Sequence, residues 1–122
     1  NISIEHAVGF ELTRKCLGER RITAFVAVND MVAYGVLDAI RAEGRRVPED
    51  YSVCGFDNIF PSQFLPVGLT TVEHYIADNA FEILHSKMSG ESSDRNITRV
   101  EFKHHLIVRD STAAPRGEEK TG

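Results

Sequence analysis

The sequence has few cysteines, no long apolar run and no excess of basic charge. Its two cysteines, Cys16 and Cys54, lie far apart among apolar neighbours, so we expect two buried thiols in a reducing cytoplasm. No apolar run approaches the roughly 18 residues that a membrane span requires. Residues 1–10 lack the basic start and apolar core of a signal peptide. The chain does not begin with Met, and we expect it to be a piece of a longer protein.

The charge balance argues against nucleic acid as a direct partner. The 122 residues include 14 Lys and Arg against 18 Asp and Glu, a net charge of −4. That sign is wrong for a domain whose affinity comes from neutralising phosphates. Any contact with DNA is therefore expected through a neighbouring domain outside this sequence.

Catalytic and cofactor motifs are also scarce. No Ser, Thr or Cys stands in a nucleophile-elbow context, and a glycine-rich phosphate loop is missing. The five histidines are single residues on predicted helices or the neighbours His104 and His105, whose side chains point to opposite faces of a strand. No set of residues has the spacing of a metal site. We expect no enzymatic activity, no metal and no cofactor.

What the sequence does contain is an alternation of helices and strands. Apolar spacing predicts helices over residues 5–17, 30–43 and 74–88, and buried strands over residues 22–28 and 51–56. The third helix is expected to bury a stripe of Ile76, Ala80, Ile83 and Leu84. Strands joined by helical crossovers are parallel neighbours. The predicted fold class is therefore α/β, a three-layer parallel sheet with helices on both faces.

Two predicted strands end in short polar residues. Asn29 and Asp30 follow the first strand, and Asp57 and Asn58 follow the second. Ligands of such sheets bind beyond the carboxyl ends of the strands. A carboxylate accepts hydrogen bonds from two vicinal hydroxyls and an amide both donates and accepts, so Asp57 and Asn29 suit a sugar-like ligand. Helix capping is the alternative role for Asn29 or Asp30, and the residues alone leave both open.

Four segments resemble, in their order and spacing, the LacI/GalR family of bacterial transcription regulators. They read AVNDMVAYG at 27–35, VPEDYSVCGFDN at 47–58, LTTV at 69–72 and LIVRDST at 106–112. The resemblance implies a type I periplasmic-binding-protein-like fold. Residues 1–112 would be mostly the C-terminal lobe of the effector-binding domain, with segments 69–72 and 97–109 crossing between lobes. Residues 113–122 are expected to form a disordered tail.

The same resemblance implies what lies outside the sequence and where the effector binds. The helix-turn-helix DNA-binding domain, the first lobe and the opening strand of the second lobe are expected elsewhere in the protein. Asn29 and Asp57 match the positions that hydrogen-bond the effector. His74 and Ile76 match positions that also face the cleft in some members.

Departures from the family pattern bear on the effector. Ile4 stands where the family often has an aromatic ring that stacks on the ligand, and it offers only apolar contact. His74 replaces a common glutamine and gives the site a titratable donor. Ala80 and Ile83 replace the small residues usual on the third helix. We therefore expect a sugar-like effector other than a simple hexose.

The segment between the second strand and residue 69 carries bulky apolar side chains without periodicity. In the family this region and the second helix form the dimer contact. We expect a homodimer, because an exposed apolar patch of that size is unusual on a monomer. The expected interface residues are Tyr34, Leu37, Ile59, Phe60, Phe64 and Leu65. The alternative is that these side chains fold back under their own loop.

The expected function is effector binding and dimerisation within a cytoplasmic repressor of the LacI/GalR type. A fragment of a periplasmic sugar-binding protein of an uptake system is the alternative. An enzyme built on a parallel α/β sheet is a third interpretation, and it would need a nucleophile or phosphate loop outside this sequence.

Overall fold

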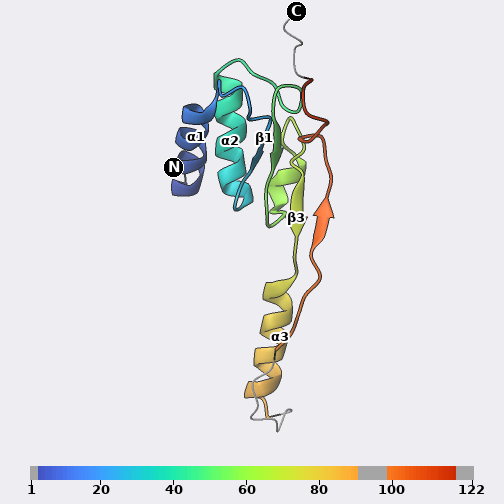
Figure 1. Ribbon diagram of the computed structural model, residues 1–122. Helices are drawn as coiled ribbons and strands as arrows, with labels where there is room; N and C mark the ends of the chain where they lie inside the picture. Colours follow the sequence, from blue (N-terminus) through green and yellow to red (C-terminus); the bar gives the residue numbers. More distant parts are fainter. Residues whose placement is uncertain (1–2, 91–98, 118–122) are drawn as a thin grey trace, which may run out of the picture.

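The structure, a computed structural model, describes residues 3–90 and 99–117 (Figure 1). Its elements in chain order are α1 (Ile4–Cys16), β1 (Ala24–Val26), α2 (Asp30–Ala42), β2 (Ser52–Cys54), the 3-10 helix η1 (Phe60–Gln63), β3 (Thr71–Glu73), α3 (Ile76–Met88) and β4 (His105–Ile107). The alternation of helices and strands expected from the sequence, and the α/β class, are confirmed.

The strands form two ladders that backbone hydrogen bonds join. β1 pairs with β2 in parallel, with Ala24 opposite Ser52, and β3 pairs with β4 in antiparallel, with Thr71 opposite Ile107. Beyond β2, the Gly55 N–H donates to the Thr70 carbonyl at 2.9 Å, in the parallel sense. The strands therefore form two two-stranded sheets, β1–β2 and β3–β4, and the parallel bridge between Cys54 and Thr70 joins β2 to the residue before β3.

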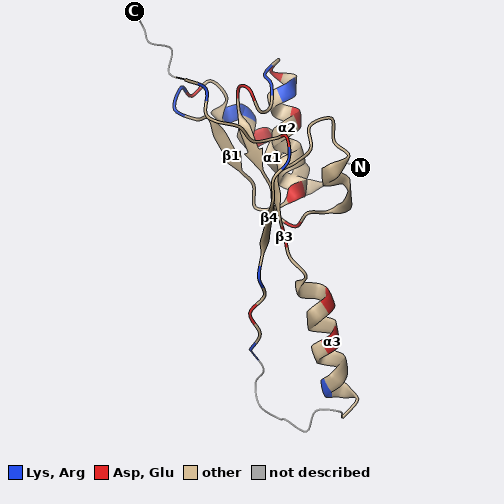
Figure 2. Ribbon diagram, turned by 90° about the vertical axis from the view of Figure 1, so that its right-hand side faces the viewer, with Lys and Arg blue, Asp and Glu red and all other residues tan. Residues whose placement is uncertain are grey.

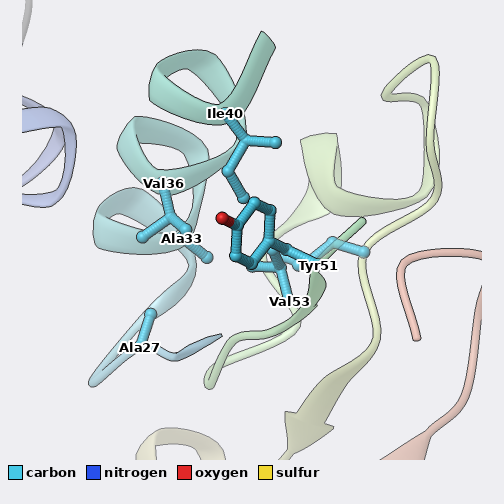
Figure 3. Packing of buried hydrophobic residues seen from close by; sticks show 7 residues of the cluster. Ala27, Ala33, Val36, Ile40, Tyr51 and Val53 are labelled. Carbon is cyan, nitrogen blue, oxygen red and sulfur yellow. The ribbon is translucent and has the colours of Figure 1, made fainter. Parts of the chain in front are cut away.

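The core lies between α2 and the strand β2. Ala33, Val36 and Ile40 project from one face of α2 towards Tyr51 and Val53 (Figure 3). Ile40 and Val53 are completely buried. Burying a side chain of this size contributes about 1.5–3 kcal/mol each, so this face of α2 anchors the helix to the sheet and fixes where its first turn lies.

Helix α1 packs closely along α2 and runs in the same direction. His6 contacts Asp38, and further along both helices Arg14 contacts Glu43. A Cβ atom at Gly35 would overlap the His6 carbonyl oxygen, so only glycine permits this approach. Because α2 begins directly after β1, both helices begin at the carboxyl end of the parallel strands.

The outward side of β1 is open, which differs from the expectation of a strand buried on both faces. Val26 and Val28 are 84% and 78% exposed, whereas Ala27 between them is buried. Side chains alternate along a strand. Ala27 points towards α2 (Figure 3), and α1 and α2 lie on the same side of β1 (Figure 1). Within the described residues, no helix covers the other side.

Helix α3 extends away from the rest of the molecule, joined to it through β3 and the segment that leads to β4 (Figure 1). None of its residues is buried, so the predicted buried stripe is wrong: Ile76 is 42% and Leu84 58% exposed. Ala80 is exposed and Ile83 half-buried. No element in the described ranges packs along α3. Nor does any helix there combine the length and apolar character needed to cross a membrane.

The C-terminal expectations are only partly covered by the described residues. Of the strand expected over residues 97–109, β4 covers three residues, and residues 97 and 98 lie outside the description. Within the expected tail, the Arg116 guanidinium lies over the Tyr51 ring, 4.9 Å from its centroid, and the Ala113 N–H donates to Ser52 Oγ at 3.0 Å. Residues 118–122 lie outside the description.

Candidate functional site

The carboxyl ends of β1 and β2 meet at one edge of the sheet, called the rim here. The Asp30 N–H donates to the Phe56 carbonyl oxygen at 2.8 Å, which draws the residue after β1 against the end of β2. The register continues from Val26 opposite Cys54, so Asn29 and Asp57 follow neighbouring strands at the same level. The structure therefore brings these two predicted site residues to one edge.

Only one end of the Asn29 side chain, its Oδ1, takes part in helix capping. Its Oδ1 accepts a hydrogen bond from the Val32 N–H at 2.9 Å, so it is the N-cap of α2. No partner for its amide nitrogen is found among the described residues. Asn29 therefore has the capping role, which occupies its Oδ1 acceptor. Its amide N–H groups remain available to donate to a ligand.

Asp57 is exposed and already has one polar partner. Its Oδ1 lies 2.9 Å from Nε2 of His74. Because an ionised carboxylate only accepts hydrogen bonds, the imidazole donates through Nε2. In the described part of the chain, the other carboxylate oxygen, Oδ2, has no partner. Asp57 can therefore accept from a ligand hydroxyl while His74 holds it in place.

Two further rings, Phe56 and His104, lie beside the His74 ring of this pair. The centroid of Phe56 lies 5.5 Å from that of His74 and 5.8 Å from that of His104, and the two imidazoles are 6.0 Å apart. Nδ1 of His74 is buried and has no hydrogen-bond partner among the described residues. The sequence did not identify His104 as a neighbour of the site, because only the antiparallel pairing of β4 with β3 brings it near Phe56.

A second polar network fixes the loop that carries Asp57. Asn58 donates to the Glu73 carboxylate at 2.8 Å and accepts from Arg109 at 2.7 Å. Arg109 also donates to the Leu69 carbonyl at 2.8 Å. Hydrogen bonds from Tyr75 and Asn58 hold the pKa of Glu73 below its usual range. Arg109 is therefore bonded within the protein and helps to hold this loop in place.

The two apolar candidates lie at the ends of their helices. Ile4 is the first residue of α1 and is 83% exposed, at the same end of the sheet as Asn29. Ile76 opens α3, two residues after His74, and is 42% exposed. Both offer apolar surface near the rim without forming part of the core.

The expected interface residues occupy a different surface of α2. Tyr34, Leu37 and Leu65 line an open groove of about 610 Å³. Its polar lining includes His6, Asp38, Arg41, Arg45, Arg46 and Glu49. Next to it, Phe60 and Phe64 of the η1 region are 76% and 66% exposed, with ring centroids 5.0 Å apart. Leu65 packs against the core and Ile59 is half-buried, so the fold-back alternative describes these two and not the phenylalanines.

Comparisons with known proteins agree on one family. A profile of the periplasmic binding protein-like domain matches residues 5–112. The HTH-type transcriptional repressor PurR of Mannheimia succiniciproducens is 33% identical over 113 residues, which cover 89% of this chain and 33% of the repressor. This chain therefore spans about a third of that relative's length.

Solved structures agree with the sequence relatives. A LacI family transcriptional regulator from Arthrobacter sp. FB24, in complex with lactose, is 34% identical with a TM-score of 0.77, covering 88% of this chain and 41% of that one. The lac repressor dimer bound to operator and the anti-inducer ONPF is 29% identical with a TM-score of 0.70, covering 87% of this chain and 37% of that one. The chain belongs to the periplasmic binding protein-like family, in the form that serves LacI/GalR regulators as their effector-binding domain.

Proposed function

We propose that this chain is the effector-binding and dimerisation part of a LacI/GalR-type transcription regulator, and that a neutral sugar-like molecule binds at its rim. The observation that carries the proposal is that Asn29 and Asp57 lie at one edge of the sheet, at the ends of neighbouring parallel strands. The lactose complex of a similar regulator supports a sugar as the ligand class. Regulators of this type act on DNA, so we place the protein in the cytoplasm.

Each rim residue has a distinct proposed role. The free oxygen of Asp57 accepts a hydrogen bond from a ligand hydroxyl, and the Asn29 amide donates one. His74 orients Asp57 through the 2.9 Å contact. Ile4 and Ile76 supply apolar contact to the carbon face of the ligand.

The charge distribution favours a neutral ligand over an anionic one. Basic residues gather where α1 and α2 end, with Arg14, Lys15 and Arg41 in the last turns, far from α3 (Figure 2). At the rim, Asp57 is acidic and Arg109 is occupied by Asn58 and Leu69. A phosphorylated or acidic sugar would therefore meet the Asp57 carboxylate, and Arg109 would not be available to pair with it.

The proposed mechanism is a shift of population between two arrangements of lobes. The rim lies where β3 and β4 leave towards α3, which we assign to the other lobe. A ligand that contacts both lobes favours one arrangement by its difference in affinity for the two. The dimer then presents its DNA-binding domains differently. We propose no enzymatic activity.

Isothermal titration calorimetry on the intact protein tests the site. The sugars ribose, galactose and lactose are screened first by thermal shift, and the one that stabilises most is titrated. Asp57→Ala and Asn29→Ala should each weaken binding by about 1–3 kcal/mol, because each strands a hydrogen-bonding partner. Glu11→Ala, an exposed carboxylate on α1, should leave affinity unchanged. Unchanged affinity in both rim variants would remove these residues from the site, and sugar binding without DNA binding would favour the periplasmic alternative.

We also propose a homodimer through the groove beside α2 and the exposed phenylalanines of the η1 region. The groove carries both signs of charge, with arginines and histidine beside Asp38 and Glu49, so two copies related by a twofold axis can complement each other. The similarity to the lac repressor dimer supports this assembly.

A further inference from the structure

One carboxylate lies completely buried between the rim and the groove. Asp30, the first residue of α2, has no exposed surface. A buried carboxylate is costly unless hydrogen-bond donors satisfy it. Since Asn29 provides the cap of α2, the Asp30 side chain has a different task.

Asp30 accepts hydrogen bonds from three segments that follow β2. Its Oδ1 accepts from the Thr71 hydroxyl at 2.6 Å. Its Oδ2 accepts from the Ile59 N–H at 3.0 Å and from the Ser62 hydroxyl at 2.5 Å. A Cβ atom at Gly55 would overlap Oδ1, so glycine leaves room for the carboxylate. The first turn of α2 is thereby tied to the loop after β2, to η1 and to β3.

Towards the rim, these bonds enclose Asp57. The Asp30 N–H binds the Phe56 carbonyl on one side of Asp57, and the Asp30 carboxylate binds the Ile59 N–H on the other. Asp57 and Asn58 between them have φ angles of 108° and 50°, in the left-handed region that side chains rarely adopt. Both ends of this strained loop are held by Asp30.

On the groove side, the Asp30 carboxylate determines the direction of the hydrogen bond between the Ser62 and Tyr34 hydroxyls. Ser62 has a single proton, which it donates to Asp30, so the Tyr34 hydroxyl 2.8 Å away must donate to Ser62 Oγ. Tyr34 lines the groove, and its burial raises the pKa of its phenol. Ser62 also belongs to η1, which positions the exposed Phe60 beside the groove. Asp30 therefore fixes residues of both surfaces without contributing surface to either.

We propose that Asp30 is a positioning residue that couples the effector rim to the dimer surface. It rests on the function proposed above. A ligand that moves Asp57 pulls on Ile59 and Asp30, and the Asp30–Ser62–Tyr34 chain carries that displacement to the groove. Coupling of this kind requires an element that both sites bias, and the Asp30 carboxylate takes that role, since it is bonded to Ile59 beside the rim and to Ser62 beside the groove.

The test compares three variants of the intact protein. Asp30→Asn replaces one acceptor oxygen by a donor group, which must face the N–H and O–H donors that Asp30 accepts. Ser62→Ala removes the Ser62 hydroxyl that joins Asp30 to Tyr34 and keeps the bonds of Asp30 to Ile59 and Thr71, and it guards against a folding failure of Asp30→Asn. Glu43→Gln, an exposed carboxylate at the end of α2 paired with Arg14, is the matched control.

Two quantities are measured for each variant: the affinity for the sugar selected from ribose, galactose and lactose, and the dimer dissociation constant with and without that sugar. Asp30→Asn should weaken sugar binding about tenfold, because the loop that carries Asp57 is then held less firmly at its Ile59 end. In the wild type, saturating sugar should change the dimer constant. In Asp30→Asn and Ser62→Ala the ratio of the two dimer constants should fall to about one, whereas Glu43→Gln should keep the wild-type ratio.

The outcomes separate this proposal from the one it rests on. A role in stability alone would lower the melting temperature and leave the ratio of dimer constants unchanged, which would overturn the coupling. An unchanged ratio in Ser62→Ala would overturn it as well. If the wild type bound none of the sugars, the proposed function would fail first, and the coupling would fall with it.

Discussion

Asn29 and Asp30 are adjacent and both start α2, yet their side chains do different work. Asn29 caps the helix through its Oδ1, and Asp30 is buried beneath the loop after β2. The sequence offers capping as an alternative role for one of them, because short polar residues before a helix satisfy its free N–H groups. It does not predict which one, because the donors for Asp30 come from residues distant in the chain. Ser62 and Thr71 contact it only once the fold has formed.

Gly55 provides a test of this packing at a single residue. Gly55→Ala adds a Cβ that would overlap Asp30 Oδ1 and lie 3.0 Å from Leu69 Cδ2. Displacing a buried, fully bonded carboxylate should lower the free energy of unfolding by about 1–3 kcal/mol. Urea denaturation of the intact protein measures it. Gly117→Ala, whose added Cβ would meet nothing within 4 Å, is the control and should show no change. A Gly55→Ala variant as stable as the wild type would show that the residues around Asp30 shift to accommodate the added Cβ.

The candidate site could be predicted in part from its residues. Asn29 and Asp57 were predicted to lie at the same edge of the sheet, because parallel strands end at a common edge, and the structure places both there. That Asp57 is held by His74 was not predicted, although Asp57 was selected from its place after a strand and His74 through the family resemblance. His104 carries no signal of its own, because its place beside Phe56 follows from how β4 returns along β3.

At the scale of elements, the helices were predicted closely and the strands too long. Residues 5–17 were expected as the first helix, and α1 covers Ile4–Cys16. The run over residues 22–28 contains the three-residue β1, because a ladder extends only as far as a partner strand pairs with it. Helix α3 forms as predicted, but its apolar stripe is exposed. Periodicity identifies the face that a helix would bury and says nothing of whether a partner is present.

The β3 strand carries a pH-dependent contact. Hydrogen bonds from Tyr75 and Asn58 lower the pKa of Glu73, so its carboxylate binds protons less readily in the folded state than in the unfolded one. The resulting stabilisation is complete above the unfolded pKa of a glutamate and disappears as pH falls through the lowered folded value. We therefore expect the melting temperature to fall on acidification below about pH 4.5, the ordinary value for this group.

Two variants isolate that contribution, measured as melting temperature against pH in the intact protein. Glu73→Gln should lose part of the acid dependence, because it cannot titrate. Tyr75→Phe should shift the Glu73 transition to higher pH, since it removes the largest cause of the lowered pKa. Glu82→Gln, an exposed acid on α3, should leave the profile unchanged. A profile for Glu73→Gln that matched the wild type would contradict the assignment.

At the scale of the whole molecule, many large apolar side chains of the described residues are exposed, and contiguous apolar patches are unusual on a monomer. Some of these residues lie on α1 and around β4, and three further groups are the outward side of β1 with Val26 and Val28, the stripe of α3, and the η1 region with Phe60 and Phe64. Because the chain spans about a third of its relative PurR, we propose that the rest of the regulator covers the first two. The third adjoins a groove lined by both charges, which favours a second copy.

Phe64 and Phe81 allow the proposed dimer to be tested with matched side chains. Both are phenylalanines of similar exposure, 66% and 64%, but Phe64 follows η1 beside the groove and Phe81 lies on α3. An aromatic side chain in the centre of an interface contributes about 1–2 kcal/mol or more, so Phe64→Ser should weaken dimerisation about tenfold. Phe81→Ser should leave it unchanged. Sedimentation velocity of the intact protein over a range of concentrations measures both constants. Equal dimer constants for the two variants would mean that the copies meet through another surface, and a wild type that stays monomeric at high concentration would mean that they do not meet at all.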